Sequence, residues 1–290
     1  MGERHADGRK VFFKEKTILI TLVLLLAAAL FCLPLSVAAA HNNRSAVLLM
    51  DAESGKVLYA ENAEAKMEIA STTKILTAIT VIENADIFMN ATIPVAAVGV
   101  EGSSIYLREG ESWRVLDLLY GLMLRSGNDA AVALAILTSG SVENFATKMN
   151  QTAVKAGAKN SNFVNPHGLH DKNHYSTAAD LAKITAYAMK CKIFAEIVKT
   201  KTHKAVKLTP TGEESVTFYN KNKLLYSYPY ATGVKTGYTT HSGRCLVSAA
   251  EKDGRKLVCV VLNVYDTYGV TKGLFDRYFC KKAQDRAEIS

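Results

Sequence analysis

Ser71-Thr-Thr-Lys74-Ile-Leu-Thr-Ala-Ile-Thr-Val-Ile82 carries apolar residues at the spacing of one helix face. The pattern predicts a helix that begins at Ser71, so free backbone N–H groups and the positive end of the helix dipole lie beside this serine. Lys74 follows three residues later, which places both side chains on one face. A lysine can deprotonate a serine hydroxyl when burial or a nearby cation lowers the lysine pKa. The pair is a candidate nucleophile and base, although a capping serine followed by a surface lysine has the same pattern.

The remaining segments divide into strands at both ends and helices between them. Two apolar runs around the turn Asp51–Gly55 predict a hairpin of strands Ser45–Met50 and Lys56–Tyr59. The expected central helices are one capped by Ser112, then Asp129–Thr138, Val142–Ala156 with a stop at Gly157, and one opened by Ser176. Strand-like runs follow near 204–208, 215–219, 232–238, 244–250 and 256–263, and a closing helix is expected at Val270–Phe279. The order predicts an α+β fold: an antiparallel sheet from both ends of the mature chain, flanked by helices, with a central helical block.

The N-terminal region is typical of an export signal. Basic residues precede Thr17–Ala40, which carries no charge and ends in small residues. The ending favours cleavage, but so long an apolar run can also remain in the bilayer as an anchor. We therefore expect residues 1–40 to be an export signal or N-terminal membrane anchor, and residues 41–290 to form a single catalytic domain.

The charge balance disfavours nucleic acid as a partner. The chain has 35 basic and 27 acidic residues, a net charge of +8, and the excess is spread along its length. Nucleic-acid binding favours a clustered basic stripe, which the sequence lacks. A moderately basic surface suits an anionic cell wall or membrane.

Cysteine spacing specifies no disulfide in the exported part. Cys191, Cys245, Cys259 and Cys280 form no CxxC pair. Cys245 and Cys259 fall on expected hairpin partners around Lys252–Gly254, but the register does not set them opposite each other. Buried free thiols are therefore expected.

Two further short motifs carry polar groups suited to catalysis. Ser126-Gly127-Asn128 lies between two helical stretches, where a hydroxyl and an amide on one turn can relay a proton and hold a carbonyl group. Lys235-Thr236-Gly237 lies in a strand-like run, and Gly237 leaves room for a substrate backbone beside the strand. Each motif alone also has an ordinary structural explanation.

The three motifs together resemble the S-x-x-K, S-D-N and K-T-G set of β-lactamases and penicillin-binding proteins, with SGN as the middle element. The sequence resembles the low-molecular-weight penicillin-binding proteins, the serine-type D-alanyl-D-alanine carboxypeptidases. The likeness covers residues 43–280. Its longest stretches are Glu101–Gly110, Leu118–Ala131, Asn165–Leu169 and Thr232–Thr239.

The resemblance implies catalytic roles for Ser71, Lys74 and Ser126, and places Lys235 and Gly237 among the substrate-binding residues beside them. Ser71 would attack the carbonyl of the penultimate D-alanine of a peptidoglycan stem peptide and form an acyl-enzyme. Lys74 would be the base, and Lys235 would help to keep it neutral. Ser126 would pass a proton to the departing D-alanine. Water would then release the shortened peptide, and β-lactam antibiotics would be covalent inhibitors.

The resemblance also implies the substrate contacts. Asn128 would orient the substrate amide, and the backbone N–H groups of Ser71 and Tyr238 would form the oxyanion hole. Thr236 and Thr239 would bind the terminal carboxylate. The resemblance implies neither a cofactor nor a metal, and it implies a location outside the cytoplasm.

The sequence departs from the family pattern in two places. Some members grip the terminal carboxylate with an arginine after the last strand, where this chain offers only Lys272. Either Lys272 or Arg244 takes its place, or the contact is absent. Many members also carry a second β-rich domain and a C-terminal membrane helix. This chain stops at Ser290, so we expect any anchoring to come from its N-terminus.

The histidines His167, His170 and His174 invite a zinc interpretation. Loop histidines beside proline and glycine more often make local hydrogen bonds, so we expect no metal there. A triad of Ser71, a histidine and Asp180 is superfluous, because Lys74 already supplies a base.

Three alternatives remain open on the sequence. A β-lactamase of class A needs a glutamate on a loop after the middle motif, and no Glu-x-x-Leu-Asn pattern follows Asn128. A non-catalytic sensor of β-lactams or wall fragments would keep Ser71 and Lys74. It should also carry a cytoplasmic signalling domain, whereas only sixteen residues precede the apolar run. Transpeptidation would use the same acyl-enzyme with an amine in place of water.

Overall fold

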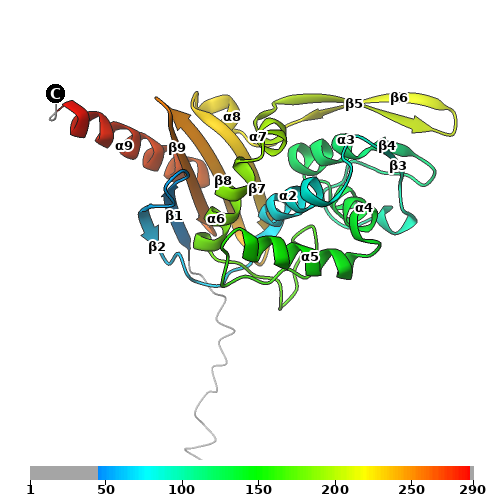
Figure 1. Cartoon of the computed structure of the whole chain (residues 1–290), viewed down its shortest axis with the longest axis horizontal. Helices are drawn as coiled ribbons and strands as arrows, with labels where there is room; N and C mark the ends of the chain where they lie inside the picture. The colour runs from blue at the N-terminus through cyan, green and yellow to red at the C-terminus, as the bar shows by residue number, and fades with distance from the viewer. Residues whose placement is uncertain (1–44, 288–290) are drawn as a thin grey trace, which may run out of the picture. The chain divides into compact units, whose positions relative to one another are not determined.

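Strand β1 (Ala46–Asp51) is apolar on both faces, as expected for a strand inside a sheet and not at its edge. A computed structural model describes residues 45–287, and the expected export segment, residues 1–40, lies outside the described residues. β1 pairs antiparallel with β2 (Val57–Glu61) on one side and with β9 (Arg255–Leu262) on the other. The order β2-β1-β9-β8-β7 is completed by β8 (Gly243–Lys252) and β7 (Ala231–Thr239), so β7 is an edge strand (Figure 1).

The alternation of side chains along this sheet supplies two hydrophobic cores. Leu48 and Val260 belong to the core shared with the helical block, whereas Leu49 and Val261 belong to the core that includes Phe275 of the C-terminal helix. Helix α6 (Ala178–Met189) contacts β1 and β9, and α9 (Thr267–Ala287) contacts β8 and β9. The sheet is thus buried on both faces.

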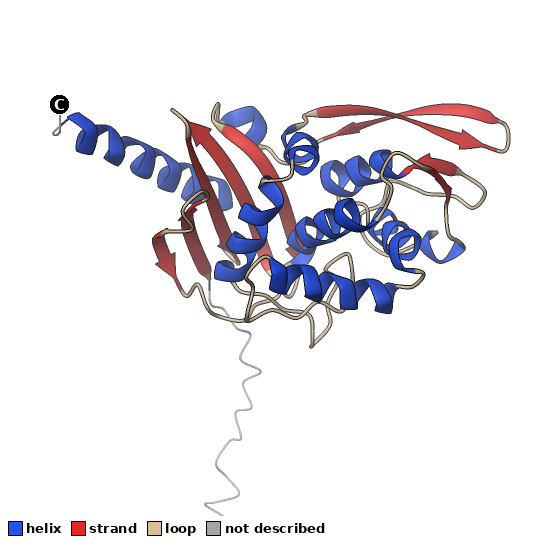
Figure 2. Ribbon diagram, viewed as in Figure 1, coloured by secondary structure: helices blue, strands red, loops and turns tan. Residues whose placement is uncertain are grey.

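A block of helices lies beside this sheet (Figure 2). Its members, with the flanking short helix α8, are α2 (Lys74–Asn84), α3 (Val115–Tyr120), a π-helical turn (Gly121–Arg125), α4 (Asn128–Ser139), α5 (Val142–Lys155), α6, α7 (Lys192–Lys199) and α8 (Leu224–Ser227). Within the described residues, no single helix is long and apolar enough to cross a membrane. The consecutive helices α4 and α5 reach that length and composition only as a pair bent by 86°.

A second antiparallel sheet packs against the helical block, beside α3 (Figure 1). Its order is β3 (Asn90–Thr92), β4 (Ser112–Arg114), β5 (Thr202–Thr209) and β6 (Gly212–Tyr219). Ser112 pairs with Leu208 in this sheet, so the expectation that Ser112 caps a helix is wrong. The buried Trp113 of β4 stacks on Phe218 of β6 within this sheet, and both rings belong to the core that includes the helical block.

The α+β class is confirmed, and the differences are local. α6 is capped by Thr177, whose hydroxyl accepts from the backbone N–H of Asp180, and not by Ser176. α7 was not predicted, and the closing helix is longer than expected.

The cysteines follow the expected register. Cys245 faces Leu262 and Cys259 faces Ser248 across the hairpin. Both are free and buried, and burial raises the pKa of Cys245 to about 11 and of Cys259 to about 12. Cys280 is exposed and Cys191 partly so, so buried thiols were correctly expected for only two of the four.

Candidate active site

Ser71 lies on a short 3-10 turn (Ala70–Thr73) that leads into α2. The helix was expected to begin at Ser71, whereas its α-helical part begins at Lys74. The turn is held by Thr72, whose backbone N–H and hydroxyl both donate to the carbonyl oxygen of Ile69. Ala70 has a positive φ of 45°, a conformation that L-residues rarely adopt. Ser71 therefore sits on a tight turn ahead of the helix.

Lys74 is wholly buried, with 0% of its surface exposed. Its Nζ donates to Oγ of Ser71 at 2.9 Å and to Oδ1 of Asn128 at 2.7 Å. A third hydrogen bond, at 2.7 Å, reaches the carbonyl oxygen of His167. All three of these acceptors are uncharged.

The surroundings of Lys74 favour its neutral form. Burial lowers the pKa of Lys74 well below its ordinary value, and the nearby cations Lys235 and Lys221 lower it further. Asp129 acts in the opposite direction. A neutral amine 2.9 Å from a serine hydroxyl is able to accept its proton.

The second motif lies on the turn before α4. Ser126 is buried and has a left-handed φ of 66°, and Asn128 opens the helix. The Asn128 side chain donates to the carbonyl oxygen of Glu101 at 2.6 Å, which aims its Oδ1 at Lys74. The structure thus brings Asn128 onto the Ser71–Lys74 pair, with Ser126 two residues away on the same turn.

The buried Asp129 fixes this turn to the preceding segment. Its carboxylate accepts from the backbone N–H groups of Ile105 and Leu107 and from the hydroxyl of Ser104. A carboxylate satisfied in this way holds the backbone of a loop rigidly. Asp129 was not singled out in the sequence, although it directly follows the motif.

The third motif lies on the edge strand β7. A Cβ atom at Gly237 would lie 3.1 Å from the backbone nitrogen of Ser71, so the strand passes directly beside the nucleophile. Lys235 is buried and donates from Nζ to the carbonyl oxygen of Thr236 at 2.9 Å. Burial, with a contribution from Lys221, lowers the pKa of Lys235 to about 7. Its charge acts on Lys74, which places the two lysines in one site.

The residues after this motif differ in exposure. Tyr238 is 65% exposed. The Thr239 hydroxyl donates to Oγ of Ser242 and accepts from the Ser242 backbone N–H, which closes the β7–β8 turn. Arg244 donates to the carbonyl oxygen of Tyr265 and lies over its ring, whereas Lys272 lies in α9.

The three loop histidines make separate local contacts. The Val164 backbone N–H donates to Nδ1 of His174, so Nε2 carries the proton and donates to Thr73. Burial lowers the pKa of His174 to about 4 and of His167 to about 3, so both are neutral at pH 7. His170 instead pairs with Glu68. The Asp180 carboxylate holds a separate loop, with Lys159 and Asn160 as backbone donors.

Two contributors to the site had no signal in the sequence. The carbonyl oxygen of His167 is a backbone group, and Lys221 is one of many lysines until folding brings it to the site. Lys221 Nζ donates to Ser103 Oγ at 3.3 Å, and its charge acts on both Lys74 and Lys235.

Comparison with known proteins agrees with this geometry. Residues 35–266 match the model of the peptidase S11 family, described as D-alanyl-D-alanine carboxypeptidase. The chain belongs to the peptidase S11 family. The S11 relatives include D-alanyl-D-alanine carboxypeptidase DacF of Bacillus subtilis, 38% identical over 228 residues, which are 77% of this chain and 57% of DacF. The D-alanyl-D-alanine carboxypeptidase of Streptomyces sp. K15 is 38% identical over 227 residues, 73% of this chain and 78% of the relative.

Solved structures show the same S11 fold. The crystal structure of the Streptomyces K15 DD-transpeptidase superimposes with a TM-score of 0.71 at 38% identity, over 74% of this chain and 88% of that one. The chain therefore matches most of the K15 protein but little more than half the length of DacF.

Proposed function

We propose that this chain is a serine-type D-alanyl-D-alanine carboxypeptidase that removes the terminal D-alanine from peptidoglycan stem peptides. One observation carries the proposal: the Ser71 hydroxyl lies 2.9 Å from the amine of a buried lysine whose pKa is strongly lowered. Membership of the S11 family and the names of its relatives supply the substrate class.

The acylation step uses Lys74 as the base. Its neutral amine takes the proton of Ser71 as Oγ bonds to the carbonyl carbon of the penultimate D-alanine. The oxyanion that forms accepts hydrogen bonds from the backbone N–H groups of Ser71 and Tyr238. Ser126 transfers its proton to the amide nitrogen and takes up the proton held by Lys74, the C–N bond breaks, D-alanine leaves, and Lys74 is neutral again. Gly237 lets β7 pack closely beside the nitrogen of Ser71, because a side chain at this position would meet the nucleophile turn.

The deacylation step repeats the proton transfers with water. Lys74, again neutral, takes a proton from water as the water oxygen attacks the ester carbonyl. The Ser71 oxygen leaves with that proton, and the shortened peptide is released. The cationic form of Lys235, held near its titration point by burial, keeps the pKa of Lys74 low throughout.

The edge of β7 is the proposed substrate platform. One side of β7 pairs with β8, whereas its other side, beside Ser71, pairs with no strand among residues 45–287. A peptide can add to such an edge as a further strand. In this arrangement Asn128 orients the substrate amide, and Thr236 and Thr239 bind the terminal carboxylate.

The same proposal places the enzyme outside the cytoplasm. It is secreted to the cell wall if residues 1–40 are cleaved, and held at the outer face of the membrane if they are not. Cell fractionation tests this, and full-length protein in the cytosol contradicts it.

The decisive assay follows D-alanine released from a pentapeptide ending in D-Ala-D-Ala. Ser71→Ala should abolish release without loss of fold, whereas Ser215→Ala, at an exposed position on β6, should leave it unchanged. Retained activity in Ser71→Ala refutes the proposal. Transpeptidation is tested by adding an amine acceptor to the same assay. A product in which this amine is joined to the peptide reveals it, an activity named for the K15 protein.

A second assay separates this function from a β-lactamase and a sensor. Penicillin should acylate Ser71, and its tethered leaving amine should block the approach of water, so intact-mass spectrometry should show a stable adduct. Rapid return of free enzyme would indicate a β-lactamase. A stable adduct without any D-alanine release would indicate a sensor.

A further inference from the structure

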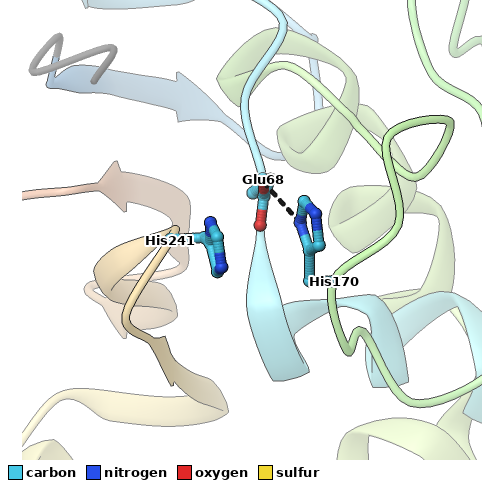
Figure 3. A group of neighbouring side chains, drawn as sticks. All are labelled: Glu68, His170 and His241. Carbon is cyan, nitrogen blue, oxygen red and sulfur yellow. Dashed lines mark hydrogen bonds and ion pairs between the residues drawn. The ribbon is translucent and has the colours of Figure 1, made fainter. Parts of the chain in front are cut away.

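Three side chains with metal-ligating atoms meet near the candidate active site, and none of them belongs to the proposed catalytic set. They are Glu68, His170 and His241, and their ligand atoms all lie within 4.8 Å of one another (Figure 3). Each comes from a different part of the chain. Such convergence from distant segments is unlike the sequence cluster of His167, His170 and His174, of which only His170 takes part.

The contacts within this group leave it open to solvent. His170 Nδ1 lies 2.8 Å from Oε1 of Glu68, and the imidazole rings of His170 and His241 stack with centroids 4.2 Å apart. Both histidines are exposed, and the Glu68 side chain is 29% exposed. A hydrated cation can therefore reach the group without any rearrangement of the fold.

The donor set is that of a transition-metal site. Two imidazoles and one carboxylate are the protein ligands of many zinc sites that keep a position for water. The nitrogen lone pairs lie in the ring planes, so the stacked rings must turn about their Cβ–Cγ bonds to point at one ion. Their exposure leaves room for this rotation.

We propose that Glu68, His170 and His241 bind a single Zn²⁺ ion, with water at the remaining coordination position. The proposal rests on this geometry and does not depend on the peptidase activity.

The position of the site gives zinc a defined structural effect. Glu68 lies three residues before Ser71, and His170 lies three residues after His167, whose carbonyl oxygen accepts from Lys74. His241 lies on the turn that joins β7 to β8. One ion bound to all three would fasten together three segments around the candidate active site. Zinc should therefore raise the thermal stability of the folded protein.

The proposal is tested by calorimetric titration with ZnCl₂. The full-length protein is kept in mild detergent and is first freed of bound metal with a chelator. We expect one saturable site in the wild type. Glu68→Gln, His170→Ala and His241→Ala should each weaken binding at least about tenfold, the scale on which metal sites lose affinity when their shell is altered. The neighbouring exposed variants Lys172→Ala and Thr240→Ala should bind as the wild type does.

Two further measurements keep the test independent of folding. Circular dichroism without zinc should be the same for all variants, and zinc should raise the melting temperature of the wild type but not of His241→Ala. Co²⁺ bound in place of Zn²⁺ should show the visible absorption bands typical of a four-coordinate ion with nitrogen and oxygen ligands. The proposal is overturned if the wild type shows no saturable binding of zinc, or if all three ligand variants bind zinc as tightly as the wild type does.

Discussion

The buried amine of Lys74 and the amide oxygen of Asn128 lie 2.7 Å apart, which joins the first turn of α2 to the first turn of α4. An amide oxygen accepts a hydrogen bond without adding negative charge. Lys74 is thus positioned by a neutral partner, and its pKa remains low.

Asn128→Asp should raise the pKa of Lys74, because a carboxylate beside the amine favours its charged form. Less neutral base is then present at pH 7, so the rate of acylation by penicillin should fall at least about tenfold. The acidic limb of the pH profile should move to higher pH. Measurement of acylation between pH 5 and 10 checks this, with the exposed Asn90→Asp as the matched control. An unshifted limb would contradict the role given to the neutral partner.

Substitution by arginine separates the two lysines. Lys74→Arg should be almost inactive, because guanidinium does not deprotonate at usable pH. Lys235→Arg should keep part of the activity, since a cation remains where it lowers the pKa of Lys74. D-Alanine release by both variants gives the ranking, and the reverse order would mean that Lys235 is the base.

Lys221→Gln tests a residue that the sequence did not reveal. Its charge lowers the pKa values of Lys74 and Lys235, so its removal should raise both. More of Lys74 is then protonated at neutral pH, and kcat/KM should fall roughly two- to tenfold, with recovery at higher pH. Lys204→Gln, at an exposed position on β5, is the control. A uniform loss at every pH would instead indicate a substrate contact.

Two glycines of similar backbone conformation test how tightly the nucleophile turn is packed. Gly168 has a φ of +86°, and a Cβ atom there would overlap the carbonyl oxygen of Ala70. Gly157 has a φ of +90°, but its nearest neighbour, Lys183 Cδ, would lie 3.8 Å away.

Gly157→Ala should therefore cost about 1–2 kcal/mol from the backbone alone. Gly168→Ala should cost at least about 2 kcal/mol more, because backbone atoms must move, and it should also slow acylation by displacing the turn of Ser71. Chemical denaturation and penicillin binding measure the two effects. Equal stability of the two variants would show that the turn is not held by this contact.

The sequence predicted those features that depend on local pattern. The apolar periodicity located α4 and α5, and the alternating strands located the hairpin of β8 and β9. The three motifs identified residues that the fold brings together. The Asn128 side chain accepts a hydrogen bond from Lys74, and the backbone at Gly237 passes beside Ser71.

Features that depend on distant partners were not predictable. Ser112 resembles a helix cap, but pairing with Leu208 of β5 makes it a strand residue. The α-helical part of α2 starts at Lys74, after a turn against which Gly168 and Gly237, both far away in sequence, pack closely. The carbonyl oxygen of His167 carries no signature at all, since every residue has one.

The place of β1 between β2 and β9 has a consequence for folding kinetics. Val47 pairs with Val261, 214 residues further along the chain, so the sheet cannot close until nearly the whole chain is available. Before that, β1 has only its hairpin with β2, and an isolated hairpin is marginally stable. Closure of so long a loop makes folding slow. Because β7, at the far edge of this sheet, flanks Ser71, we expect nascent or truncated chains to lack the proposed catalytic centre, and recovery of penicillin binding to mark the final stage of refolding.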